Sequence, residues 1–64
     1  MTDLPITYGQ AILSKRSLLR LTQDDVAKAA GIMRSTLIDI EYERIEITEN
    51  TYNKILAAMQ DQPI

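Results

Sequence analysis

Residues 21–41, LTQDDVAKAAGIMRSTLIDIE, contain two runs of apolar positions at helical spacing on either side of a glycine. This pattern predicts two short helices joined by a tight turn. Thr22 suits the N-cap of the first helix, and Asp25 three residues later makes a weak capping box with it. Gly31 is expected to stop this helix after Ala30, because glycine adopts the left-handed conformation without strain. The apolar face of this helix consists of Val26, Ala27 and Ala30.

The second helix of the pair is expected over about residues 34–43. Leu37, Ile40 and Glu41 share one side of it, and Met33 lies on the same side as Leu37. This side is expected to pack against the rest of the domain. The opposite, outward side carries Arg34, Ser35, Ile38, Asp39 and Tyr42.

A helix is also expected before this pair, over about residues 7–19. Pro5 suits its first turn, where the missing N–H would have no partner. Gly9 lowers the helix propensity but lets another backbone come close. The apolar positions of this helix are Tyr8, Ile12, Leu19 and, in part, Leu13.

A last helix is expected from the capping residue Thr48 through Met59. The alternation in residues 44–47, RIEI, favours a short extended link before it, and residues 60–64 are expected to form a frayed tail. The apolar set of this helix is Tyr52, Ile55, Leu56 and Met59.

The length of 64 residues and the four helical patterns predict one all-α domain over residues 1–64, with an ordered core at about 6–59. The sequence contains neither cysteine nor histidine. Zinc sites and the usual nucleophile–base pairs need these residues, and we also find no phosphate-binding loop. We therefore expect a protein that is not an enzyme and has no metal, cofactor or small-molecule ligand.

The chain shows no apolar run of about 20 residues, the length that a membrane-spanning helix needs. Its first ten residues lack the basic-then-apolar layout of a signal peptide. A cytoplasmic location is therefore expected.

Charge is distributed unevenly along the chain, although the formal net charge is only −2. An acidic balance counts against general nucleic-acid binding. However, Lys15, Arg16 and Arg20 make residues 1–21 positive, and four glutamates make residues 41–49 negative. A molecule with this polarity can still present one positive face to a partner.

The segments SKR at residues 14–16, LTQDDVAKAAGI at 21–32, STLIDIE at 35–41 and TENTYNKILAAM at 48–59 resemble the phage repressor/Cro-like helix-turn-helix family, which includes Xre-type regulators. The resemblance covers about residues 6–59. It implies a compact lambda-repressor-like domain of four or five helices. It also implies a DNA-binding transcriptional regulator, usually a repressor-type homodimer on a palindromic operator in double-stranded DNA.

The resemblance also assigns roles to individual residues. Gln23 would hold a phosphate, and Thr36 would lie beside the DNA backbone. Arg16 and Glu41 match a buried ion pair of the family, and the high cost of an unpaired buried charge agrees with this pairing. Base edges in the major groove would be contacted by Arg34, Ser35 and Asp39. A phosphate of the DNA would be contacted by Arg44, in the loop after the second helix of the pair.

The chain departs from the family pattern at four places. Met33 stands where the second helix of the pair usually has a capping Ser or Thr. Arg20 and Glu43 stand where glycines commonly follow helices. The loop that is usually basic reads ERIEITE at residues 43–49. An alternative function therefore remains open, in which the fold is a protein-binding antiactivator or antirepressor module with an acidic surface that attracts a basic protein partner.

Overall fold

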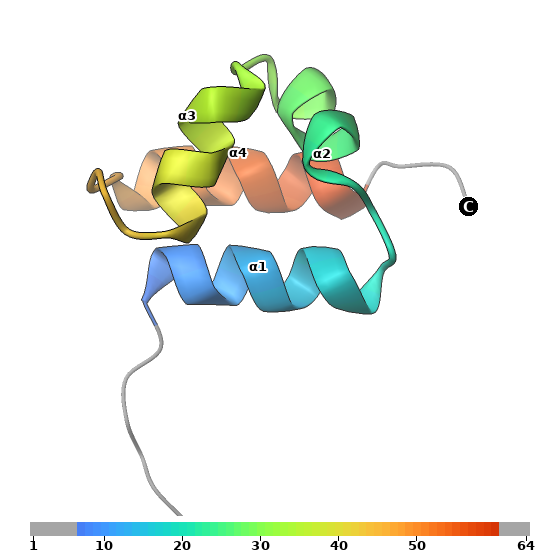
Figure 1. Cartoon of the computed structure of the whole chain (residues 1–64), viewed down its shortest axis with the longest axis horizontal. Helices are drawn as coiled ribbons and strands as arrows, with labels where there is room; N and C mark the ends of the chain where they lie inside the picture. Colours follow the sequence, from blue (N-terminus) through green and yellow to red (C-terminus); the bar gives the residue numbers. More distant parts are fainter. Residues whose placement is uncertain (1–6, 61–64) are drawn as a thin grey trace, which may run out of the picture.

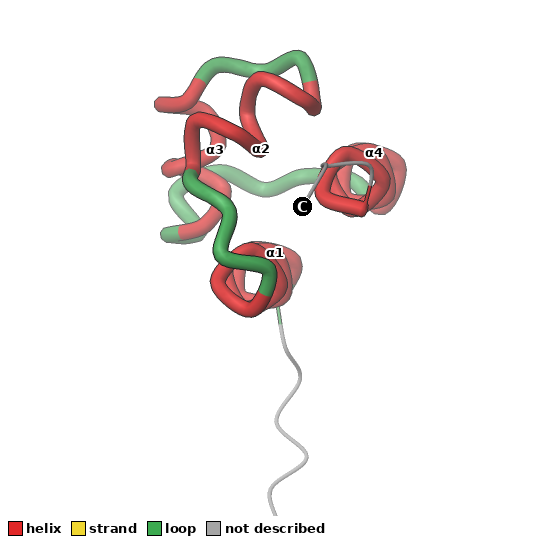
Figure 2. The backbone as a smooth tube through the Cα atoms, turned by 90° about the vertical axis from the view of Figure 1, so that its right-hand side faces the viewer, coloured by secondary structure: helices red, strands yellow, loops and turns green. Residues whose placement is uncertain are grey.

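The computed structural model describes residues 7–60, which form four helices and contain no strand. The helices are α1 (Tyr8–Leu18), α2 (Gln23–Ala30), α3 (Arg34–Glu41) and α4 (Glu49–Gln60). The axes of α1 and α4 run in a similar direction, and α2 and α3 lie across them (Figures 1 and 2). The predicted all-α architecture is confirmed. The expectations for Pro5 and for residues 61–64 lie outside the described residues.

Side-chain caps begin three of the four helices. The hydroxyl of Thr22 accepts a hydrogen bond from the Asp25 amide at 3.0 Å, and the Asp25 carboxylate accepts one from the Thr22 amide at 3.1 Å. The bond that the Thr22 amide donates to the Asp25 carboxylate lowers the pKa of Asp25 below its ordinary value. Thr7 and Thr48 accept comparable bonds at 3.2 Å at the starts of α1 and α4. Only α3 begins without a side-chain cap, at Met33.

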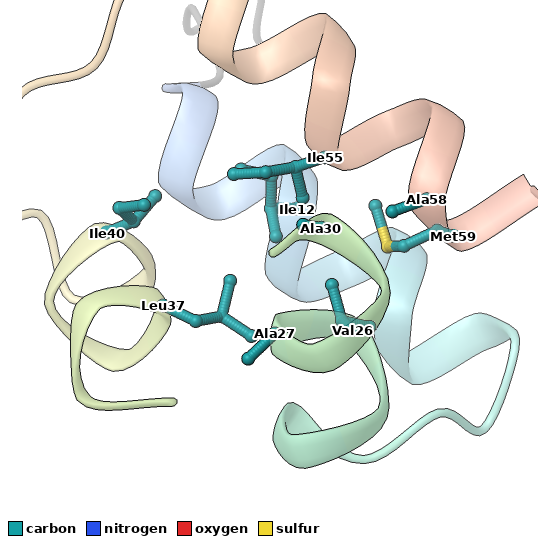
Figure 3. Close-up of a cluster of buried hydrophobic side chains, with 9 residues drawn as sticks. All are labelled: Ile12, Val26, Ala27, Ala30, Leu37, Ile40, Ile55, Ala58 and Met59. Carbon is teal, nitrogen blue, oxygen red and sulfur yellow. The ribbon is translucent and has the colours of Figure 1, made fainter. Parts of the chain in front are cut away.

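The core lies where all four helices meet (Figure 3). Ala27 of α2 and Leu37 of α3 both belong to this core, so α2 contributes a small buried residue to it. The buried apolar faces of α2, α3 and α4 therefore agree with the sequence pattern. The buried apolar residues are Ile12, Val26, Ala27, Ala30, Leu37, Ile40, Ile55, Ala58 and Met59.

Three predictions at the ends of helices were wrong. Leu19 is 43% exposed because α1 ends at Leu18, and Leu21 packs against the core instead. Met33 is 69% exposed because it precedes α3 with an extended backbone, outside the helical register. Finally, α3 ends at Glu41, two residues earlier than expected.

The early end of α3 and the ends of α1 and α2 share one backbone arrangement. At each end a residue has a positive φ: 58° at Arg20, 73° at Gly31 and 62° at Glu43. The following amide donates to a carbonyl five residues earlier, as from Leu21 to Arg16 at 3.0 Å. This is the hydrogen bond of a Schellman motif, which favours glycine at the positive-φ position. Two of the three positions therefore hold a charged residue in a backbone conformation that glycine would adopt with less strain.

We expect Arg20→Gly to stabilise the fold, because it relieves this strain. The left-handed penalty of about 1–2 kcal/mol exceeds the entropic cost of about 0.5–1 kcal/mol that glycine adds. The free energy of unfolding should rise by about 0.5–1 kcal/mol and the melting temperature by a few degrees. Thermal and urea unfolding measure both quantities. Arg20→Ala is the matched control, since it removes the same charge but keeps the strain, and equal stability of the two variants would contradict the argument.

Candidate nucleic-acid interface

The first turn of α3 presents polar side chains to solvent. Leu37 and Ile40 are buried, which turns the opposite side of the helix outward. Arg34 and Ser35 are exposed and Thr36 is half-buried. Within residues 7–60, Arg34 forms no ion pair, so its guanidinium is available to an external acceptor. These three predicted residues therefore lie together at the start of one short helix.

An ion pair between Arg16 and Glu41 anchors the other end of α3. Arg16 Nε donates to Glu41 Oε2 at 2.7 Å, and Nη2 donates to Oε1 at 3.2 Å. The side chain of Glu41 is only 1% exposed and that of Arg16 is 14% exposed. Two-pronged contacts of this kind fix geometry as well as charge. The predicted ion pair between α1 and α3 is confirmed.

Gln23 joins this ion pair, which the sequence did not predict. Its side-chain amide donates to Glu41 Oε1 at 3.0 Å, and Arg16 Nη1 donates to the Leu21 carbonyl at 3.0 Å. The ends of α1 and α3 and the start of α2 are thereby tied together. In the described part of the chain, every buried side-chain nitrogen and oxygen has a hydrogen-bond partner. Gln23 therefore has a structural contact, whereas its predicted phosphate contact stays a prediction.

Asp39 and Arg44, both predicted to contact DNA, face each other. Arg44 Nη1 lies 3.4 Å from Asp39 Oδ1, and the Arg44 guanidinium lies 5.5 Å from the centre of the Tyr42 ring. The side chains of Arg44 and Asp39 are 65% and 40% exposed, so this pair contributes little to stability. Its main consequence is electrostatic, since each charge offsets the other on the outward face of α3.

A shallow hollow separates the start of α2 from the start of α3. It brings Gln23 and Arg34 to one rim although they are far apart in the sequence. An arginine and a side-chain amide are both suitable donors to phosphate oxygens. Asp24 also lines the hollow and would oppose a phosphate. The residues around the hollow are Arg16, Leu21, Thr22, Gln23, Asp24 and Arg34.

The structure also bears on other classes of site. Within residues 7–60, no group of three or more acidic residues is placed to hold a metal ion. None of the four described helices is long and apolar enough to cross a membrane. Comparisons with models of known protein families and with curated proteins find no match.

Proposed function

We propose that this protein is a DNA-binding transcriptional regulator of the phage repressor/Cro-like helix-turn-helix type, with α3 as the recognition helix. The observation that carries the proposal is the exposed first turn of α3, which bears Arg34 and Ser35 on a helix anchored at its far end by the Arg16–Glu41 pair. Recognition helices of this type present the residues of their first turns to base edges in the major groove.

In this proposal, each residue has a defined contact. The Arg34 guanidinium donates two hydrogen bonds to a guanine, and Ser35 contacts an adjacent base edge. Gln23 uses its second amide hydrogen for a phosphate while it keeps its bond to Glu41, and Thr36 contacts the backbone. Phosphate contacts set the register of the helix, and base contacts select the sequence. Asp39 accepts from a cytosine amine when Arg44 turns from it to a phosphate.

The test is selection of binding sites from a random pool of double-stranded DNA, followed by titration of the selected site at several salt concentrations. A selected consensus sequence with an affinity that falls steeply as salt rises supports the proposal. If no sequence is enriched and the protein does not bind DNA at low salt, the proposal of a DNA-binding regulator is wrong.

Arg34→Ala is expected to relax sequence preference at one base pair and to leave the fold intact. Loss of a two-pronged contact to guanine removes about 1–3 kcal/mol of discrimination. The ratio of the affinities for the selected site and for a site with another base pair at that position should therefore fall by roughly 5- to 150-fold. Competition between the selected site and its point variants measures that ratio. Lys54→Ala removes the same charge from α4 and should leave the ratio unchanged. An unfolded Arg34→Ala protein would mean that this side chain does not face solvent.

A second candidate function is a module of the same fold that binds a basic protein partner. The Asp39–Arg44 pair and the exposed glutamates Glu43 and Glu46 favour it, because they reduce the positive charge next to α3. In this case the selection would yield no consensus. A stable complex with a co-purifying DNA-binding protein, disrupted by Glu46→Lys, would identify the antiactivator or antirepressor function instead.

A further inference from the structure

An open groove of about 480 Å³ lies between the start of α1 and the loop that connects α3 to α4. Its volume falls in the range of about 300–1,000 Å³ that ligand pockets of proteins span. The groove is more apolar than polar, and the ring of Tyr8 in its lining stacks on Tyr52 of α4 with 4.5 Å between ring centres. We call this feature the acidic groove, and its main lining residues are Tyr8, Ile40, Glu43, Ile45, Glu46 and Ile47.

The acidic groove is matched to a basic, apolar occupant. Ile45 is 43% exposed, which leaves apolar surface open to a partner. Glu43 and Glu46 form no ion pair with any residue in the range 7–60, so their charges face the groove's occupant uncompensated. An apolar contact with an unpaired acidic rim attracts a surface that combines leucine-like side chains with cations.

A surface of this composition lies on the chain itself, at the other end of α1. Leu18 is 82% exposed, the highest exposure among the large apolar residues of the range 7–60, and Leu19 is 43% exposed. Lys15 lies three residues before Leu18 and four residues before Leu19, so the three side chains lie on the same side of the end of α1. Arg20 follows directly and forms no ion pair within residues 7–60. We call Lys15, Leu18, Leu19 and Arg20 the leucine corner.

Backbone strain links the two surfaces. Arg20 and Glu43 are the two residues other than glycine with a positive φ in the described chain. One belongs to the leucine corner and the other to the acidic groove, and they carry opposite charges. Strain that a glycine would relieve is commonly retained where the side chain has a function. Here the two strained residues carry opposite charges, which would form an ion pair if the leucine corner of one copy of the chain met the acidic groove of another.

We propose that the acidic groove of one copy binds the leucine corner of a second copy, so that copies associate head to tail. The two surfaces lie at opposite ends of α1, which runs along the long axis of the molecule (Figure 1). A contact between different surfaces leaves one groove and one corner free in every open assembly, so further copies can add until the assembly closes into a ring. This arrangement replaces the two-fold dimer that the family resemblance implies. On DNA, it would favour sites repeated in the same direction over a palindrome.

Analytical ultracentrifugation of the purified protein, without DNA, tests the contact independently of the proposed function. The average mass should rise above that of the monomer with protein concentration, pass that of a dimer, and fall as salt is added. A mass that stays monomeric at low salt, or that stops at a dimer, would overturn the head-to-tail arrangement.

Two glycine variants separate association from folding. Glu43→Gly and Arg20→Gly each relieve strain, so both proteins should be at least as stable as the wild type. Each also removes a charge from the contact and should weaken association at least tenfold. Leu18→Ser should do the same without a folding cost, since Leu18 is exposed. Asp24→Asn, which removes a negative charge outside the acidic groove, is the control and should associate like the wild type. Unchanged association of the glycine variants would refute the contact.

Mixing two charge-reversed variants tests which surfaces meet. Glu46→Lys damages only the acidic groove, and Arg20→Glu damages only the leucine corner, so each protein alone should be monomeric. In an equimolar mixture, the intact groove of the Arg20→Glu copy can bind the intact corner of the Glu46→Lys copy. The two altered surfaces again carry opposite charges and can pair as well, so the mixture should associate although neither protein does so alone. A mixture that remains monomeric would show that these two surfaces do not bind each other.

Discussion

Arg16→Met is expected to leave the protein largely unfolded at room temperature. The substitution removes the guanidinium that donates two hydrogen bonds to Glu41, whose side chain is 1% exposed. A buried carboxylate without its partner costs about 3–5 kcal/mol. A single small core supplies about 3–5 kcal/mol at this chain length. The lost interaction is therefore comparable with the whole stability of the domain, and it also removes the link from α1 to the Leu21 carbonyl.

Far-ultraviolet circular dichroism and urea unfolding measure this effect. The informative control is the double variant Arg16→Met with Glu41→Met, which replaces both charges by apolar side chains of similar length. Such replacements of buried ion pairs are often neutral or stabilising, so the double variant should fold far better than the single one. If Arg16→Met alone changed the free energy of unfolding by less than about 0.5 kcal/mol, the pair would behave as an exposed one.

The parts of the fold that the sequence predicted are those with local causes. The start of α2 depends on Thr22 and Asp25, which are three residues apart, and its end depends on Gly31. The buried faces follow from the spacing of apolar residues along each helix. The errors at Leu19 and Met33 lie at helix ends, where one residue more or less of helix changes the direction of a side chain.

The ends of α1 and α3 were marked by the resemblance to a family and not by local backbone propensity. Arg20 and Glu43 have low preference for a left-handed backbone, so propensity alone extends α3 to Glu43. The resemblance marked both as positions where glycines are common, and both have a positive φ in the structure. Both residues keep this conformation at the expense of local strain.

The candidate interface was predictable only in part. Arg34 and Ser35 are exposed as the helical pattern predicted, because the pattern fixes which side of α3 is buried. The pairing of Asp39 with Arg44 was not predicted, since it depends on where the chain turns after α3. The bond from Gln23 to Glu41 joins two helices and has no local signal in the sequence.

Gly9→Ala is expected to lower the free energy of unfolding, although helix propensity alone predicts an increase. Inside an exposed stretch of helix, alanine in place of glycine stabilises by about 1 kcal/mol. At Gly9, however, α1 crosses the end of α3 so closely that an added methyl group would overlap the carbonyl oxygen of Ile40. It would also lie 3.2 Å from the Glu41 carbonyl oxygen and 3.3 Å from Glu43 Cγ. Two of these three neighbours are backbone atoms, so side-chain rotation cannot make room.

The helices must therefore separate to accept the methyl group, and this separation loosens the packing of Ile12 and Ile40 in the core. Overpacking of this kind costs about 1–3 kcal/mol and occasionally more, which outweighs the gain in helix propensity. We expect Gly9→Ala to lower the free energy of unfolding by about 2 kcal/mol in urea titrations. Ser14→Ala, on the exposed side of the same helix, is the control and should change it by less than about 0.5 kcal/mol. A Gly9→Ala protein as stable as the wild type would mean that α1 and α3 are farther apart than this crossing requires.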